Sequence, residues 1–428
     1  MRVFKFGGAS VKDADAVRNL AEILKEGDKE KLVVVVSAMG KTTNNLEEVV
    51  SSYYEKDGKA QKLLNDIRKF HTDIMTELFD DTKAPVFNDV NNFFVEAEWV
   101  LDEEPSKGYA FAYDQIVSTG ELVSTRIISE YLKSIGLGNE WLDCRGCIRT
   151  DNTYREGNVE WGVTTDLIKG QVDAAWKKQD LIITQGFIGC TSENYTTTLG
   201  REGSDYSAAI FAHCLDVGEM VIWKDVQGVL NADPKHFPDA QKLEMISYLD
   251  AIELAYYGAS VIHPKTIKPL ENKNITLQVR SFLEPERKGT LVGTDMPTKP
   301  LIPSFIIKFN QVLLSISAKD FSFIAEDNLS LIFKHFAEHG VKINMMQNSA
   351  ISFSACIDND KFKVPGLMES LQRNFKVLFN DDLKLYTIRH YYPSTIEMLT
   401  EGKEVLVEQR SRHTAQFVVR SEETVEHG

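Results

Sequence analysis

Four consecutive valines, Val33 to Val36, restrict what this chain can fold into more than any other feature. An unbroken β-branched run lacks the alternation of a half-exposed strand. It is typical of a central strand in a parallel sheet that is covered on both faces. Segment 31–38 therefore predicts an α/β fold. The small and polar residues that follow, 37–44, lie where open α/β sheets place their ligands, past the carboxyl end of a strand.

The N-terminal segment predicts an anion-binding turn. Residues 2–6 predict a short buried strand that contains one charged residue, Lys5. Gly7 and Gly8 then form a sharp turn, and Asp13 begins an amphipathic helix. A strand, a glycine turn and a helix leave unpaired backbone N–H groups where an anion can bind, and Lys5 adds a positive charge. The pattern is not the GxxxxGK[ST] loop, so by itself it also fits an ordinary tight turn.

Length and charge limit the classes of protein to consider. A chain of 428 residues predicts two or three domains, and a net charge of −15 argues against general binding to nucleic acid or membrane surfaces. No apolar run approaches the ~18 residues of a transmembrane helix, and the N-terminus lacks a signal-peptide pattern. Five scattered cysteines suit a reducing compartment, so we expect a cytoplasmic protein.

A second glycine-rich unit follows the buried strand predicted at 181–186. Its polar loop leads to Arg201, Ser204 and Asp205, and either of the last two is expected to cap the next helix. An arginine at a helix mouth suits a carboxylate ligand, which it can hold through two parallel hydrogen bonds.

Two other patterns leave their interpretation open. Residues 114–135 predict one periodic helix in which Glu121 lies near the apolar face. That carboxylate is either half-exposed and unimportant or held for a cation of a ligand, and the pattern alone favours the first. Cys144 and Cys147 form a CxxC pair with no second pair at metal-ligand spacing, so we interpret the spacing as accidental and predict no metal site.

The C-terminal part changes character. Segment 285–303 is rich in Pro, Gly and Thr and predicts a linker after a domain at 1–284. Residues 304–428 show a β-α-β-β pattern twice, at about 304–380 and, in a shortened copy, at 381–428. Split βαβ folds of this ferredoxin-like kind are usually binding or pairing modules.

Five motifs occur in order along the chain: KFGGAS at 5–10, VSTGELVSTR at 117–126, TTTLGREGSDYSAA at 196–209, WKDVQGVLNADP at 223–234 and GASVIHP at 258–264. Together they resemble aspartate kinase, which has the amino-acid kinase fold: an open, mainly parallel sheet with helices on both faces. TTTLGR-x-GSD is the most specific of them. The C-terminal modules resemble the ACT regulatory modules of that family.

The resemblance implies ATP-dependent phosphorylation of the β-carboxylate of L-aspartate to 4-phospho-L-aspartate, the first step toward lysine, threonine and methionine. The acceptor carboxylate, with a pKa of ~3.9, is already ionised at neutral pH and needs no general base. Catalysis then rests on positioning and charge neutralisation. Mg²⁺ is implied, held mainly by ATP phosphates and water.

The family pattern also implies roles for individual residues. Lys5 would stabilise the transferred phosphoryl group, and Asp205 would orient the cationic side chains. The expected aspartate-binding residues are Thr43, Glu121, Phe187, Arg201 and Ser204. The expected nucleotide-binding residues are Lys5, Gly7, Gly8, Ser10, Lys224, Asp225 and the loop from Gly228 to Lys235.

Three positions depart from the family pattern. The family often has a phosphate-contacting lysine where Ser260 stands, a threonine where Lys224 stands, and an arginine where Lys235 stands. Lys224 or Lys265 could replace the lysine charge at 260, or that charge is missing.

Other readings of the motifs remain. The chain could be a kinase for glutamate, acetylglutamate or carbamate, or an amino-acid sensor without activity. TTTLGR-x-GSD and the ACT modules argue against the first, and Lys5, Arg201 and Asp205 against the second. The length argues against a bifunctional kinase–homoserine dehydrogenase.

The resemblance further implies a homodimer formed through the ACT modules, with an amino-acid effector. Lysine-sensitive members carry carboxylates at positions that align, by count, with Asn344 and Ala350. Neither residue brings a charge, and burying an ammonium without a charged partner is costly. We therefore expect lysine alone to inhibit weakly or not at all. Threonine, or a lysine–threonine pair, stays open because Gln347 and Asn348 could serve a smaller polar ligand.

Overall fold

The computed structural model describes residues 1–26, 30–105, 107–259, 262–320 and 322–420. The chain forms two compact units. The N-terminal unit comprises Met1–Val229, Lys242–Ile252 and Val261–Thr298, and the C-terminal unit comprises Leu230–Gln241, Glu253–Ser260 and Lys299–Gly428. Two segments that precede residue 284 are thus counted with the C-terminal unit. Within the described ranges, no helix is long and apolar enough to cross a membrane.

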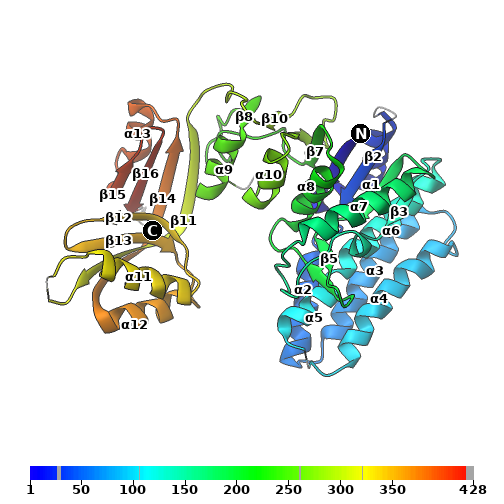
Figure 1. Ribbon diagram of the computed structural model, residues 1–428, viewed down its shortest axis with the longest axis horizontal. Helices are drawn as coiled ribbons and strands as arrows, with labels where there is room; N and C mark the ends of the chain where they lie inside the picture. The colour runs from blue at the N-terminus through cyan, green and yellow to red at the C-terminus, as the bar shows by residue number, and fades with distance from the viewer. Residues whose placement is uncertain (27–29, 106, 260–261, 321, 421–428) are drawn as a thin grey trace, which may run out of the picture. The chain divides into compact units, whose positions relative to one another are not determined.

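The N-terminal unit is built on an eight-stranded sheet of order β3-β4-β2-β1-β7-β9-β10-β8 (Figure 1). Its strands are β1 (Arg2–Phe6), β2 (Leu32–Val36), β3 (Glu140–Leu142), β4 (Leu181–Gln185), β7 (Glu219–Lys224), β8 (Met245–Ser247), β9 (Thr276–Ser281) and β10 (Thr290–Gly293). β1 pairs in parallel with β2 on one side and β7 on the other. Among the described pairs of this sheet, β9 with β10 is the antiparallel one. The predicted mainly parallel sheet is confirmed.

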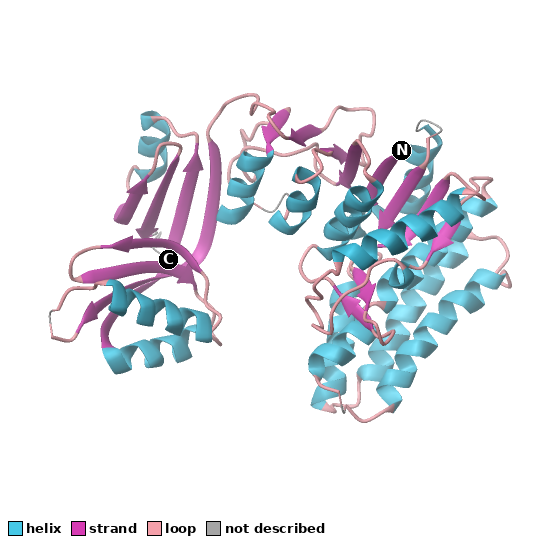
Figure 2. Cartoon of the chain, in the orientation of Figure 1, coloured by secondary structure: helices cyan, strands magenta, loops and turns pink. Residues whose placement is uncertain are grey.

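Helices cover both faces of this sheet (Figure 2). Val33 to Val36 point alternately to opposite faces and are all fully buried, and both α6 and α8 contact β2. The helices in the first 298 residues are α1 (Ala14–Glu26), α2 (Thr42–Glu55), α3 (Ala60–Leu78), α4 (Pro85–Asp102), α5 (Tyr109–Val117), α6 (Thr119–Ser134), α7 (Trp161–Trp176), α8 (Gly203–Leu215), α9 (Tyr248–Tyr257) and α10 (Pro264–Glu271). A small hairpin, β5 (Ile188–Cys190) with β6 (Thr196–Thr198), precedes α8.

Local chemistry explains where several of these elements begin and end. As predicted, Asp13 opens α1, because its Oδ1 accepts the N–H of Ala16 at 2.8 Å. The single helix predicted at 114–135 is wrong, because α5 ends and α6 begins at Ser118. The Ser118 hydroxyl donates to the Gln115 carbonyl at 3.1 Å and competes with the helical ladder.

Two further predictions need correction. Neither Ser204 nor Asp205 caps α8, because the helix already begins at Gly203 and its N-cap residue is Glu202, which has a left-handed backbone. Segment 285–303, predicted as a linker, contains β10, which pairs with β8 and β9. The side chain of Val292 in β10 is fully buried, so hydrophobic burial outweighs the turn-like composition there.

The C-terminal unit is a six-stranded antiparallel sheet of order β12-β13-β11-β14-β16-β15. Its strands are β11 (Ser304–Ala318), β12 (Ile343–Asn348), β13 (Ser352–Asp358), β14 (Phe375–Arg389), β15 (Glu404–Arg410) and β16 (Thr414–Arg420), and its helices are α11 (Glu326–Glu338), α12 (Val364–Asn374) and α13 (Pro393–Thr400). One hydrophobic core lies under α11 and α12 and another under α13. The unit therefore has two halves, as the repeated pattern suggests.

The two halves share their central strands. β11 and β14 are each 15 residues long. The start of β11, from Ser304, pairs with the end of β14 at Arg389, and the end of β11, at Ala318, pairs with the start of β14 at Phe375. β11, the first strand of the repeat predicted at about 304–380, thus also forms part of the sheet of the repeat predicted at 381–428.

Candidate active site

The turn after β1 lies directly against the loop after β2. A Cβ atom on Gly8 would lie 2.9 Å from the carbonyl oxygens of Ala38 and Gly40, so this close approach requires glycine. The Gly40 N–H donates to the Gly8 carbonyl at 3.0 Å. A Cβ on Gly7 would lie 3.3 Å from the Lys5 ammonium, so the absence of a side chain there leaves the cation uncovered.

Three charged side chains meet beside this turn. The Lys5 Nζ atom lies 2.5 Å from Asp205 Oδ1, and the Lys224 Nζ atom lies 3.6 Å from Asp205 Oδ2. Burial would raise the pKa of the Asp205 carboxyl, but the two ammonium groups outweigh it and hold that pKa below its ordinary value. Asp205 therefore stays ionised and holds two cations side by side, an arrangement suited to a polyanion.

Glu121, in the first turn of α6, is 2% exposed. The interpretation of Glu121 as half-exposed is therefore wrong. Its Oε1 accepts the Ala38 N–H at 3.4 Å, whereas its Oε2 has no hydrogen-bond partner among the described residues. Burial raises the pKa of this carboxyl to about 8. A buried carboxylate oxygen without a partner favours a cationic ligand group.

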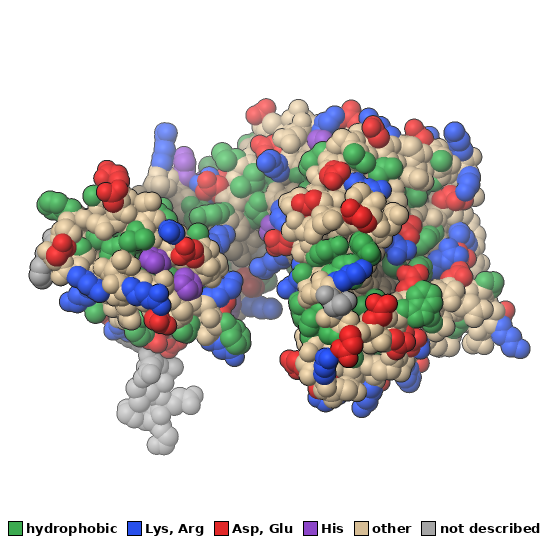
Figure 3. Space-filling view, turned by 60° about the horizontal axis from the view of Figure 1, so that its bottom comes forward, with side chains coloured by type: hydrophobic (Ala, Val, Ile, Leu, Met, Phe, Trp, Pro, Cys, Tyr) green, Lys and Arg blue, Asp and Glu red, His purple; other side chains and the backbone are tan. Residues whose placement is uncertain are grey.

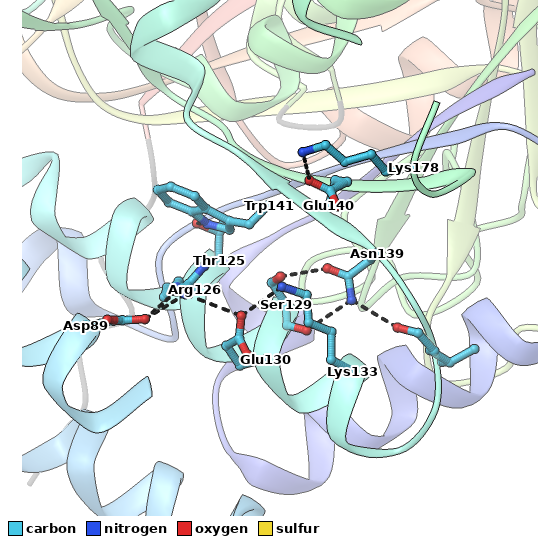
Figure 4. Close-up of polar contacts among 11 residues, drawn as sticks. Asp89, Thr125, Arg126, Ser129, Glu130, Lys133, Asn139, Glu140, Trp141 and Lys178 are labelled. Carbon is cyan, nitrogen blue, oxygen red and sulfur yellow. Dashed lines mark hydrogen bonds and ion pairs between the residues drawn. The ribbon is translucent and has the colours of Figure 1, made fainter. Parts of the chain in front are cut away.

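Side-chain contacts of Thr125 and Arg126 hold α6, the helix that carries Glu121 (Figure 4). The Thr125 hydroxyl donates to the Glu121 carbonyl at 2.8 Å and accepts from Trp141 Nε1 at 3.0 Å. At the next residue, the Arg126 guanidinium pairs with Asp89 of α4 at 2.6 Å. The start of α6 is thus anchored from two sides, which limits the movement of the carboxylate.

These groups open into one cavity of about 810 Å³. Its wall includes every residue that the sequence assigned to catalysis or to the amino-acid substrate: Lys5, Thr43, Glu121, Phe187, Arg201, Ser204 and Asp205. Phe187 adopts a left-handed backbone (φ 69°), and its N–H donates to the Ser207 hydroxyl at 2.9 Å. That conformation places the ring beside Gly203, where a Cβ would lie 2.6 Å from it.

The residues predicted for the nucleotide are less uniformly placed. Lys5, Gly8 and Lys224 line the cavity. Ser10 is buried, and its hydroxyl donates to the Trp223 carbonyl at 3.3 Å, which ties the turn to β7. Gly7 and Asp225 are neighbours of lining residues in the chain.

Three other residues lie further along the chain. Gly228 (φ 143°) packs against Thr290. Lys235 belongs to a segment of the C-terminal unit, where its N–H donates to Asp233 Oδ1 at 2.9 Å. Ser260 lies outside the described residues. Nucleotide contacts therefore stay predictions.

The cavity wall also contains charged residues that the sequence reasoning missed: Glu47, Arg155, Glu156 and Glu202. Tyr113 joins them, and its hydroxyl donates to Glu47 Oε1 at 2.5 Å. Arg155 and Glu156 lie in a polar loop without periodicity, so no local signal marked them. On the face shown in Figure 3, acidic and basic side chains are interspersed.

The CxxC pair lies apart from this cavity. Both thiols are free and fully buried, and burial raises the pKa of Cys144 and of Cys147 well above the ordinary value for a thiol. The Cys144 thiol donates to the Ile188 carbonyl at 3.3 Å. Among the described residues, no group of three or more His, Cys, Asp or Glu side chains is arranged to hold a metal ion. That this pair binds no metal stays a prediction.

Known proteins match the chain over most of its length. The model of the amino acid kinase family matches residues 1–281. Lysine-sensitive aspartokinase 3 of Escherichia coli (strain K12) is 32% identical over 362 residues, which are 83% of this chain and 78% of that protein. Chloroplastic aspartokinase 1 of Arabidopsis thaliana is 31% identical over 378 residues, 84% of this chain and 63% of that protein.

Solved structures agree in fold. E. coli aspartokinase III in complex with aspartate and ADP superposes with a TM-score of 0.84 and 26% identity, over 98% of this chain and 96% of that one. The same enzyme in complex with lysine and aspartate gives a TM-score of 0.81 over the same shares.

Proposed function

Because the chain belongs to the amino acid kinase family and, within it, to the aspartokinases, we propose that its cavity binds ATP and L-aspartate and transfers the γ-phosphoryl group to the β-carboxylate. The observation that carries this proposal is the pair of ammonium groups that Asp205 holds in the cavity containing Glu121 and Arg201. The product is 4-phospho-L-aspartate.

The chemistry of the step explains the side chains around it. The acceptor carboxylate is ionised at neutral pH and attacks without a general base. The transferred phosphoryl group passes through a loose transition state with its charge spread over three oxygens, so the protein contributes by positioning and by neutralising charge. Lys5 and Lys224 supply that charge. Asp205 holds both ammonium groups in place, and its lowered pKa keeps it ionised.

Recognition of aspartate divides between a carboxylate and an arginine. The Oε2 atom of Glu121, which has no hydrogen-bond partner in the described part of the chain, accepts a hydrogen bond from the α-ammonium of the substrate, and Arg201 binds the α-carboxylate. Because burial raises the pKa of Glu121 to about 8, arrival of an ammonium favours loss of the carboxyl proton. Thr43, Phe187 and Ser204 complete the wall of this half of the cavity.

The nucleotide takes the other half, beside the turn after β1. The N–H groups at Gly7 and Gly8, together with Lys5 and Lys224, are the groups we assign to its phosphates. Mg²⁺ would be bound by phosphate oxygens and water, because Asp205 is already paired with two cations and the described residues hold no cluster of metal-binding side chains. When bound, the ion neutralises part of the phosphate charge.

The C-terminal unit serves regulation in this proposal. Split βαβ modules commonly pair with a second copy, so we propose a homodimer formed through this unit, with an amino-acid effector. The E. coli relative is lysine-sensitive by name. In this chain Asn344, which aligns by count with a carboxylate of lysine-sensitive members, donates to Gln311 and Asp358 and accepts from Lys308. We therefore propose that lysine alone inhibits weakly or not at all. Five free, buried thiols suit a reducing cytoplasm.

The experiment that tests the activity is a hydroxamate assay for acyl phosphate with ATP, Mg²⁺ and a panel of acids. Aspartate should give product, whereas glutamate, acetylglutamate and carbamate should not. Product from glutamate but not from aspartate would favour a different amino-acid kinase. Amino-acid binding without any acyl phosphate would favour a sensor without activity.

A further inference from the structure

The backbone of Arg155 adopts a conformation that favours glycine. Its φ angle is 69°, in the left-handed region, where a long side chain is disfavoured. The residue is nevertheless held firmly, since its N–H donates to both oxygens of Asp114 at 3.1 and 2.9 Å. Strain of this kind persists where surrounding contacts determine the conformation, and it often marks a functional site.

Asp114 ties this loop to the strand that precedes Arg201. The carboxylate is fully buried, and besides the Arg155 N–H it accepts the N–H of Thr198 at 3.0 Å and its hydroxyl at 2.7 Å. Burial raises the pKa of Asp114 to about 6, so the group is still mostly ionised at neutral pH. The loops also touch directly, because a Cβ on Gly200 would lie 3.3 Å from the Arg155 carbonyl oxygen. Asp114 and the contact at Gly200 therefore hold the loop of Arg155 against the segment that carries Arg201.

The Arg155 side chain is stacked on one wall of the cavity. Its guanidinium carbon lies 4.5 Å from the ring centroid of Tyr113 and 5.6 Å from that of Tyr109. Tyr113 is fixed in turn by its hydrogen bond to Glu47. No ion pair joins the guanidinium to a carboxylate within the described part of the chain. Its planar face is thus occupied, while its N–H donors are available to a ligand in the cavity that it lines.

The balance of charge in the cavity gives these donors a role. Besides Glu121, whose buried carboxyl is mostly protonated at neutral pH, three glutamates line it, Glu47, Glu156 and Glu202, while the two lysines are paired with Asp205. An acidic amino acid entering this wall meets carboxylates, and the arginines are the cations that can offset them. A single arginine satisfies only part of a carboxylate, which accepts at about four lone-pair positions.

We propose that Arg155 is a second arginine for the α-carboxylate of the substrate, beside Arg201, and a determinant of specificity for acidic amino acids over their α-amides. This inference rests on the proposed function. The neutral α-amide of aspartate keeps the reacting β-carboxylate and the α-ammonium, so it isolates the group that Arg155 recognises.

The decisive variant is Arg155→Gly. Glycine adopts the left-handed conformation readily, so the variant removes the side chain without adding backbone strain. We expect the KM for aspartate to rise about tenfold, with kcat and the KM for ATP unchanged, and the preference for aspartate over its α-amide to fall by a similar factor. Arg155→Lys keeps the charge but not the planar fork, so it should recover only part of the affinity.

Asn194→Gly is the matched control. Asn194 also has a left-handed backbone (φ 66°), in the β5–β6 turn, so the change relaxes a comparable position and leaves the cavity side chains in place. Its kinetics should equal those of the parent. If Arg155→Gly melts like the parent and shows the parental KM and amide preference, Arg155 is only structural and the proposal is overturned. A fall in kcat at unchanged KM overturns it as well.

Calorimetry separates this inference from the proposed function. If the parent makes no acyl phosphate, the proposed function fails. The role of Arg155 is still decided by titrating aspartate into the parent and into Arg155→Gly and comparing the two affinities. Roughly tenfold weaker binding to the variant supports the role, whereas equal binding, or binding to neither, removes it.

Discussion

Replacing Lys5 by methionine removes the cation closest to Asp205. The Lys5 side chain is 9% exposed and its Nζ atom lies 2.5 Å from Asp205 Oδ1, whereas the remaining partner, Lys224, is 20% exposed and 3.6 Å away. Methionine preserves the apolar stem of the side chain, so the change removes a charge and leaves little cavity. What remains is a buried carboxylate with one weaker partner.

Two magnitudes follow from this geometry. Breaking a buried ion pair by removing one partner costs about 3–5 kcal/mol. Because Lys224 remains, we expect the lower end, a loss of about 3 kcal/mol in the free energy of unfolding. A fixed cation at the transferred phosphoryl group is worth on the order of 3 kcal/mol in the transition state, so kcat should fall ~100-fold with little change in the KM for aspartate.

Acid should also unfold this variant at a higher pH than the parent. The lowered pKa of Asp205 contributes stability at pH values above its ordinary pKa of 3.8, and that stability is lost as the pH falls through the folded-state pKa. Without Lys5 the folded-state pKa rises. The acid limb of the stability curve should therefore move to higher pH than in the parent.

Hydroxamate kinetics and urea unfolding measure these effects on one protein preparation. The double variant Lys5→Met/Asp205→Asn is the control, because it removes the uncompensated carboxylate and should regain most of the stability while staying inactive. Parental turnover in Lys5→Met would remove Lys5 from the mechanism. A double variant that unfolds as easily as the single one would show that the buried charge is not the cause.

Three other predictions address the substrate and the effector. Arg201→Ala should raise the KM for aspartate by roughly 30-fold, or about 2 kcal/mol, and leave nucleotide affinity intact; calorimetry showing the reverse pattern would exchange the two assignments. Because burial raises the pKa of Glu121 to about 8, kcat/KM for aspartate should increase with pH up to about 8 in the parent and lose that limb in Glu121→Gln, so a parent profile without this limb would contradict the role of the carboxylate. Lysine should inhibit weakly at subsaturating aspartate, because Asn344 is engaged with Asp358 and Lys308 and brings no charge; half-inhibition at submillimolar lysine would show that this interpretation is wrong.

The parts of the fold that sequence predicted correctly depend on local chemistry. An apolar run such as Val33 to Val36 is stable mainly as a central strand covered on both faces. Asp13 caps its helix through a contact within one helical turn. The helix break at Ser118 was not predicted, because the apolar periodicity continues across it. Strand β10 was not predicted, because its burial depends on pairing with β8 and β9, which precede it in the sequence.

The candidate site shows the same division. Lys5 and Asp205 were found through motifs and meet in the structure. The pattern around Glu121 underestimated its burial, because the loop that covers it, at Ala38, is 83 residues away. Arg155 had no signal at all, since its position depends on an aromatic wall and on the buried carboxylate of Asp114. Motifs identify groups that carry chemistry, whereas the walls of a cavity are assembled by tertiary contacts.

The strands that the two halves of the C-terminal unit share set the order in which that unit can form. β11 is synthesised first, but its opening residues pair with the closing residues of β14, from Ser304 with Arg389 to Lys308 with Leu385. Neither half can complete its sheet until β14 has left the ribosome. Pairings of such long sequence separation close slowly, and the waiting edge of β11 is open to wrong partners meanwhile. A truncation within β14 should therefore damage both halves of the unit, because each half needs part of this strand.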